Sequence, residues 1–149
     1  MTKLRGEARE VALAEAKAVL SMARDDTMRA RLAGLVTSID GDSVDGDVEE
    51  LLEQVLELGL QAGRIRAHYG PGGEQATLTT LRRLPHGRAR TESARDVTSA
   101  LGALGGTTLE RVAITAVAPG AYSLSIQAGG VEASVRLDTS GARLVSLAT

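Results

Sequence analysis

Residues 122–137 read YSLSIQAGGVEASVRL, and this stretch decides the fold. Tyr122, Leu124 and Ile126 alternate with polar side chains, and the alternation resumes after a pair of glycines. A period of two is typical of a strand with one buried face, and adjacent glycines favour the tight turn of a β-hairpin. The stretch therefore predicts two antiparallel strands joined at the glycine pair.

The same alternation continues on both sides of this hairpin. Residues 112–116 alternate before it and residues 143–147 after it, and each is separated from the hairpin by a turn that contains glycine. Strands that follow one another through short turns pair as antiparallel neighbours. We therefore expect a four-stranded antiparallel meander with one apolar and one polar face.

The N-terminal region has the composition of helices. Residues 4–24 are rich in Ala, Glu, Arg and Leu, which favour helices, and Asp25 or Asp26 is a suitable N-cap for a further helical segment. One long bent helix and a pair of helices both fit this pattern. The apolar residues of the second segment recur at helical spacing, at Met28, Leu32, Leu35, Val36 and Ile39.

An aspartate-rich loop precedes the next predicted helix. Residues 40–47 contain four aspartates and two glycines, which indicates a loop, and Asp47 is placed to cap the helix that follows. Residues 48–59 carry an apolar face at helical spacing. The glutamates expected mostly on the opposite, polar face are Glu49, Glu50, Glu53 and Glu57.

The middle of the chain predicts two strands and a third helical region. Ile65, Ala67 and Tyr69 alternate with polar residues, and a Thr-rich segment follows a glycine-rich turn. The expected elements are strands at residues 65–69 and 75–82, a polar connection at 84–90 and a helix at 92–104.

Together these elements predict an α+β fold. N-terminal helices are followed by two strands, a helix and the four-stranded meander, and we expect one twisted antiparallel sheet covered by helices. The length of 149 residues fits a single domain, 1–149, in which 1–62 is mainly helical and 63–149 is mainly antiparallel sheet with one helix.

Composition narrows the classes of function. The chain has no cysteine, no Phe, no Trp and two tyrosines, so thiol chemistry and disulfide scaffolds are excluded and base stacking has few residues available. No apolar stretch is long enough to be a signal sequence core or a membrane span. We expect a soluble, cytoplasmic protein that does not associate with membranes.

The residues that could carry catalysis or bind a metal form no known motif. In the aspartate-rich loop, the EF-hand register that starts at Asp40 places Asp45 where glycine is required and Leu51 where glutamate is required. His68 and His86 have no motif around them. We therefore predict no catalytic residue, no metal site and no cofactor.

Basic residues are concentrated in one part of the chain. Residues 36–60 carry eight acidic groups and no basic one, whereas residues 61–95 carry seven basic groups and two acidic ones. If the two strands of this region pair, the basic groups form a patch that neutralises phosphates without reading base sequence, and pairing with the Glu-rich helix is the alternative. The candidate nucleic-acid-binding residues are Arg64, Arg66, His68, Arg82, Arg83, Arg88 and Arg90.

The apolar faces of the N-terminal helices suggest a different activity. The sheet needs only one layer of helical cover, so apolar helix surface can remain for a second copy or a partner, with Met28, Leu32 and Leu35 as candidates for self-association. The alternative is that the core uses all of this surface. We therefore predict a non-enzymatic protein-interaction module, an adaptor or assembly factor that binds a protein partner or forms a homodimer. The alternative function is sequence-independent nucleic-acid binding.

Overall fold

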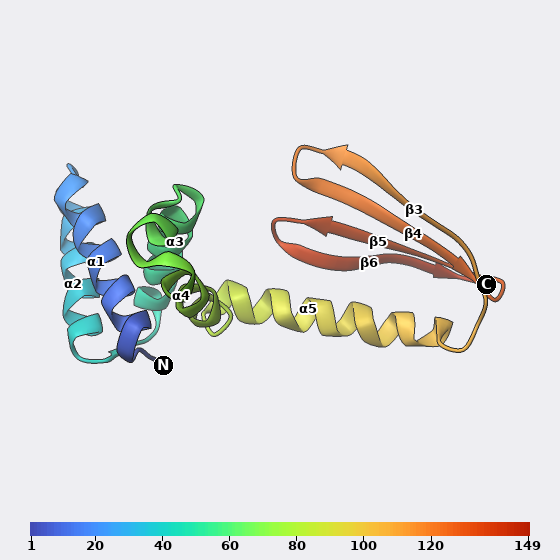
Figure 1. The fold of residues 1–149 in the computed structure, drawn as a ribbon, viewed down its shortest axis with the longest axis horizontal. Coiled ribbons are helices and arrows are strands. Elements are labelled where there is room, and N and C mark those ends of the chain that lie inside the picture. The colour runs from blue at the N-terminus through green and yellow to red at the C-terminus, as the bar shows by residue number, and fades with distance from the viewer. The chain divides into compact units, whose positions relative to one another are not determined.

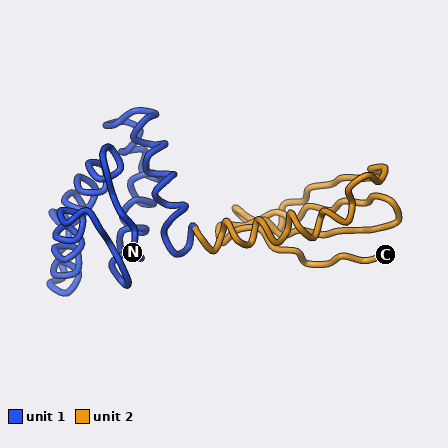
Figure 2. The backbone as a smooth tube through the Cα atoms, turned by 90° about the horizontal axis from the view of Figure 1, so that it is seen from below, with its two compact units in different colours: residues 1–87 blue, residues 88–149 orange.

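The computed structural model describes all residues, 1–149, and confirms the α+β class (Figure 1). The chain divides into two compact units, residues 1–87 and residues 88–149 (Figure 2). No helix is both long and apolar enough to cross a membrane. The elements in order are β1 Thr2–Lys3, α1 Gly6–Met22, α2 Asp26–Asp40, β2 Ser43–Val44, α3 Asp47–Gln61, α4 Arg64–Leu81, α5 Pro85–Leu101, the short 3₁₀ helix η1 Gly102–Leu104, β3 Leu109–Ala118, β4 Ala121–Ala128, β5 Val131–Asp138 and β6 Gly141–Ala148.

The first unit is a bundle of helices around an aliphatic core. The N-terminal region forms a pair of helices, and Asp25 caps the second by accepting a hydrogen bond from the backbone N–H of Met28 at 2.8 Å. Thr2–Lys3 and Ser43–Val44 form a two-stranded antiparallel sheet beside the helices. The largest buried side chains of the core are Leu4, Leu32, Leu35, Ile39, Leu52, Leu56, Ile65 and Leu84.

The predicted start of α3 needs a small correction. Asp47 is the first residue of the helix, and the N-cap is Gly46, whose φ of 56° lies in the left-handed region. The predicted polar face is also wrong in part, because Glu49 and Glu53 are buried. Both carboxylates have polar partners supplied by distant segments of the chain, which compensates for their removal from water.

The predicted strands at residues 65–69 and 75–82 are wrong, because this region is helix α4. A kink at Gly70, with φ 67° and ψ −167°, divides the helix, and Pro71 begins its second half, where a missing N–H costs nothing. The threonines that suggested a strand donate their hydroxyl hydrogens to carbonyls one turn earlier, so their polar groups are satisfied within the helix. These bonds run from Thr77 to Gly73, from Thr79 to Gln75 and from Thr80 to Ala76.

The predicted polar connection at residues 84–90 is also helical. Helix α5 begins at Pro85, seven residues before the expected start at 92, and ends close to the predicted position. Glu53 explains the early start, because its carboxylate accepts hydrogen bonds from the backbone N–H groups of His86 and Gly87 at 3.1 and 3.0 Å. A buried carboxylate thus satisfies the first turn of α5.

The four-stranded meander is confirmed, with the order β3-β4-β5-β6 (Figure 1). One row of aligned residues crosses all four strands on the apolar face, through Ile114, Leu124, Val135 and Leu144. The turn between β4 and β5 uses the predicted glycine pair, whose φ values of 54° and 76° suit a two-residue hairpin.

Within the second unit, α5 packs against the β6 side of this sheet. Val97 of α5 is buried, and Ser93 and Ala100 lie with Ala142 and Leu144 of β6 around a shallow apolar recess. At the centre of the sheet Val135 is buried, whereas the residues of β3 are almost all exposed. The helix therefore covers part of the apolar face and leaves the β3 side open.

Candidate functional site

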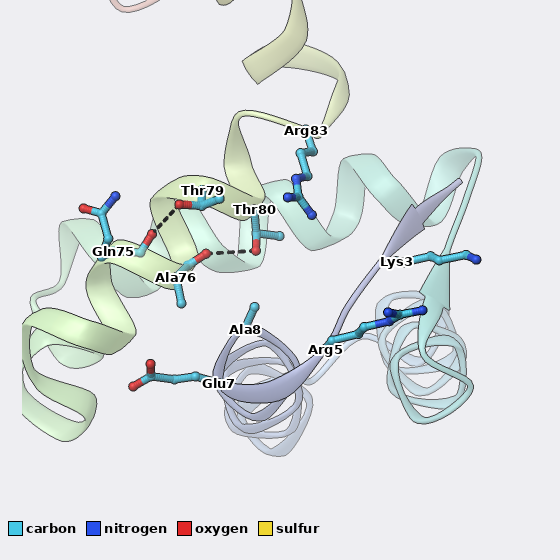
Figure 3. A pocket seen from close by; sticks show the side chains of 9 residues that line it. All are labelled: Lys3, Arg5, Glu7, Ala8, Gln75, Ala76, Thr79, Thr80 and Arg83. Carbon is cyan, nitrogen blue, oxygen red and sulfur yellow. Dashed lines mark hydrogen bonds between the residues drawn. The ribbon is translucent and has the colours of Figure 1, made fainter.

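A pocket with a charged lining lies in the helical unit, between the N-terminal strand and α4 (Figure 3). It has a volume of about 530 Å³. We call it the cationic pocket, because it has three basic side chains and one carboxylate in its wall. Its lining residues are Lys3, Arg5, Glu7, Ala8, Gln75, Ala76, Thr79, Thr80 and Arg83.

Local structure explains why basic side chains line this pocket. Residues 2–5 are extended, so their side chains alternate, and Thr2 and Leu4 are buried while Lys3 and Arg5 are exposed. Arg83 follows the end of α4, and its backbone N–H donates to the carbonyl of Thr80 at 2.9 Å. Two segments far apart in the sequence therefore supply the cations.

The charges in the cationic pocket are arranged unevenly. Figure 3 shows Arg83 extending from the end of α4 toward the N-terminal segment, Lys3 and Arg5 extending to one side, and Glu7 extending to the opposite side from Lys3 and Arg5. The Glu7 carboxylate lies instead beside Gly72, where an added Cβ atom would be 3.3 Å from Oε1. The three cations thus have no carboxylate aimed at them within the pocket.

The structure separates the residues predicted to bind nucleic acid. Arg64 pairs with Glu15 at 2.7 Å and Arg66 with Glu74 at 3.6 Å, on the first half of α4 and its neighbours. Arg82 and Arg83 follow the other end of that helix. Arg83 is the only one of the seven predicted residues that lines the cationic pocket.

The remaining predicted residues of this set lie in the first halves of two helices. His68 is exposed on α4 just before the kink. Arg88 and Arg90 lie on α5, in the second compact unit. The common strand face that would have made one patch does not exist, because the segment at residues 64–81 is helical. Sequence reasoning missed Lys3 and Arg5, although the alternation of residues 2–5 was a usable signal.

The residues predicted for self-association lie in and beside the core. Leu32 and Leu35 are fully buried, and Met28 is half-buried. Met28 lies in an apolar groove of about 310 Å³, to which Met22 and Leu58 contribute exposed surface. We call this the α1–α3 groove. Leu32 forms part of its floor, whereas Leu35 does not line it.

Three buried glutamates in the helical unit have structural partners. Glu15 pairs with Arg64, and Glu49 accepts a hydrogen bond from the Thr2 hydroxyl at 2.6 Å. Glu53 caps α5 and also lies 3.2 Å from Nδ1 of His86. Each carboxylate thus receives donors that explain its burial as part of the fold.

Tyr69 lies close to one of these glutamates and packs against the core. Burial, together with the negative charges of Glu15 and Glu10, raises the pKa of the Tyr69 hydroxyl above its usual value. The phenol therefore keeps its proton at neutral pH and up to more alkaline conditions than a free tyrosine.

The aspartate-rich loop forms ordinary surface ion pairs. Asp40 and Asp42 both contact the Arg9 side chain, at 3.3 and 2.6 Å. No group of three or more acidic or histidine side chains is placed to hold a metal ion. The loop therefore provides no specific argument for calcium binding.

The sheet carries a second surface of interest, which we call the open sheet face. Val112 and Ile114 of β3 are 51% and 64% exposed. Both are aliphatic, and an exposed apolar surface that continues across strands is uncommon on a monomer. The large apolar residues exposed on this sheet lie on β3 and β4, at Leu109, Val112, Ile114, Val117 and Tyr122, and on β6, at Leu144, Val145 and Leu147.

Comparison of the chain with protein-family models, with curated proteins and with solved structures found no match.

Proposed function

We propose that this protein is a non-enzymatic interaction module, an adaptor or assembly factor that forms a homodimer through the open sheet face. The observation that supports this proposal is the exposure of Val112, Ile114 and their neighbours on β3. Removing such side chains from water is the main favourable term in association, at about 25 cal/mol per Å² of apolar surface.

A second copy of the chain suits this face for two reasons. Residues 112–118 of β3 carry no charge, so two copies can meet there without repulsion between like charges. β3 is also an edge strand, with one side unpaired. In a twofold-symmetric dimer the same patch of each copy forms the contact. One open face and one open edge per chain are therefore sufficient to build the dimer interface.

The test is the mass of the protein in solution as its concentration rises. Sedimentation from about 1 to 100 µM, the range that resolves micromolar dissociation constants, should show conversion of monomer to dimer. Ile114→Lys should keep the chain monomeric, because it places a charge in the contact. Thr115→Lys is the matched control, since this residue is exposed on the opposite face of the same strand.

A constant monomer mass over this range would contradict the proposal. A dimer that survives Ile114→Lys but is lost in Met22→Lys would place the contact in the α1–α3 groove, nearer the residues predicted from sequence.

Nucleic-acid binding through the seven predicted residues stays an alternative prediction. The structure leaves it less support, since Arg64 and Arg66 are engaged with carboxylates. A titration with single- and double-stranded DNA and with RNA at low salt tests it, and binding by phosphate contacts should weaken steeply as salt is added.

A further inference from the structure

We propose that the cationic pocket binds a small molecule through a phosphate group. This inference concerns residues 1–87 and does not depend on the open sheet face. Three basic side chains, Lys3, Arg5 and Arg83, line this one pocket. Arg9, Arg64 and Arg66 nearby each pair with a carboxylate, whereas these three side chains take part in no such ion pair.

The charges that line the pocket favour an anion. Like charges held near one another repel, and a bound anion removes that repulsion while adding attraction to each cation. The single carboxylate of the pocket, Glu7, points away from the cations toward Gly72. The side of the pocket near Lys3, Arg5 and Arg83 therefore favours a negative group.

The geometry of the donors favours a phosphate. Two of the three cations are arginines, whose planar guanidinium groups donate paired hydrogen bonds to oxyanions. The cations belong to two separate segments, the extended N-terminus and the end of α4, so their donors lie on different sides of the pocket. A phosphate presents three terminal oxygens in different directions, whereas a carboxylate presents two in one plane, so phosphate matches donors from several directions better.

The pocket also has room for the rest of the ligand. The volume of about 530 Å³ exceeds the space that a phosphate alone would fill and lies in the range of small-molecule sites. The hydroxyl hydrogens of Thr79 and Thr80 are already donated to the carbonyls of Gln75 and Ala76, both at 2.9 Å. This wall therefore offers methyl groups, hydroxyl lone pairs and the Gln75 amide to the organic part of the ligand.

Calorimetric titration of the full chain with pyrophosphate, inorganic phosphate and citrate tests the proposal. At low salt, pyrophosphate should bind most tightly, because it carries the most phosphate oxygens, and citrate should bind more weakly at similar charge. Arg83→Gln and Arg5→Gln should each weaken pyrophosphate binding about tenfold, the loss expected for one charge-assisted contact.

Arg82→Gln is the matched control. It removes the same charge one residue away, but Arg82 does not line the pocket, so the affinity should stay within about twofold of the original. Glu7→Gln should strengthen binding, because it removes the one negative charge of the wall. Circular dichroism of each variant establishes that the helices are retained, and the two arginine variants come from different segments, so a folding defect in one leaves the other as a test.

Several outcomes would overturn the proposal. They are the absence of pyrophosphate binding at millimolar concentration, citrate binding as tight as pyrophosphate binding, and an Arg82→Gln effect as large as that of Arg83→Gln. Binding of a short single-stranded oligonucleotide that pyrophosphate does not displace would also overturn it and would favour the nucleic-acid alternative.

Discussion

The two compact units use the same kinds of aliphatic side chain with opposite results. Leu52 in the helical unit is completely buried, whereas Ile114 in the sheet unit is mostly exposed. Helices surround Leu52 on several sides, but a sheet has two faces and α5 covers only part of one of them. The difference shows that the number of packed layers, more than the hydrophobicity of a residue, decides whether it is buried.

The largest effect should come from the closed core of the helical unit. Leu52→Ala is expected to lower the free energy of unfolding by about 3–5 kcal/mol, because it removes buried methyl groups and leaves a cavity. Urea unfolding followed by circular dichroism measures this change. Leu58→Ala on the same helix is the control, since Leu58 is 47% exposed and should cost much less. Equal losses in the two variants would mean that the core is not closed as described.

The buried carboxylate of Glu53 gives the next largest effect. Glu53→Ala leaves the N–H groups of His86 and Gly87 without this acceptor at the start of α5, at an expected cost of about 2–3 kcal/mol. Glu50→Ala is the control, because Glu50 is exposed on the same helix. The same unfolding measurement applies. If the two variants were equally stable, the cap would contribute nothing to the helical unit.

In the sheet unit, the losses of unfolding free energy at a buried and at an exposed position can be compared within one row of residues. Val135→Ala should cost about 1–2 kcal/mol, since Val135 is buried on the central part of the apolar face. Ile114→Ala, two strands away in the same row, should change the stability of the monomer by less than about 1 kcal/mol. Unfolding at low concentration separates this effect from dimerisation. A larger loss at Ile114 than at Val135 would reverse the comparison.

The smallest effect concerns the turn between β5 and β6. Hydrogen bonds from the Ser140 hydroxyl and from the Ser140 backbone N–H lower the pKa of Asp138, and Arg143 and Arg136 lower it further. A lowered pKa in the folded state means that the stabilisation is present at neutral pH and is lost as the pH falls through the folded pKa.

An NMR titration of the Asp138 carboxyl group measures this shift. Its midpoint should lie below that of the denatured chain, and Ser140→Ala should move it upward. A midpoint at or above the denatured value would show that the turn does not hold the carboxylate as described.

Sequence patterns were sufficient where the contacts are local. The alternation and the glycine pair in residues 122–137 specified the central hairpin, and helical periodicity specified α3. In both cases neighbouring residues carry the information, because strand alternation, turn conformation and an apolar helix face depend on residues close in the chain.

The sequence was misleading where a polar side chain can find its hydrogen-bond partners in more than one way. The threonines of α4 favour strands by propensity, yet their hydroxyls bond to their own helix. Glu53 looked solvent-exposed because its partners, the N–H groups of His86 and Gly87, lie more than thirty residues away. No local pattern could reveal such a partner.

The candidate sites show the same division. The basic character of Arg83 was evident from sequence, but its place in one pocket with Lys3 and Arg5 depends on the pairing of β1 with β2 and on the packing of α4. Met28 was predicted to take part in self-association; it lines the α1–α3 groove, and that role stays a prediction, whereas Leu35 is buried in the core.

The uncharged part of the open edge strand bears on whether newly made protein aggregates. Residues 112–118, VAITAVA, contain no charge and no proline, and such segments are prone to form cross-β aggregates when they stay uncovered. Natural edge strands are usually protected by charges or bulges. On β3 the charged residues Glu110 and Arg111 stand at the beginning of the strand, and its pairing with β4 is irregular between Leu109 and Arg111 and again between Ala116 and Ala118. The segment between these irregularities has neither form of protection. The chain should therefore aggregate more readily when its open sheet face is unoccupied, and a single lysine at position 114 should improve its recovery from concentrated solution.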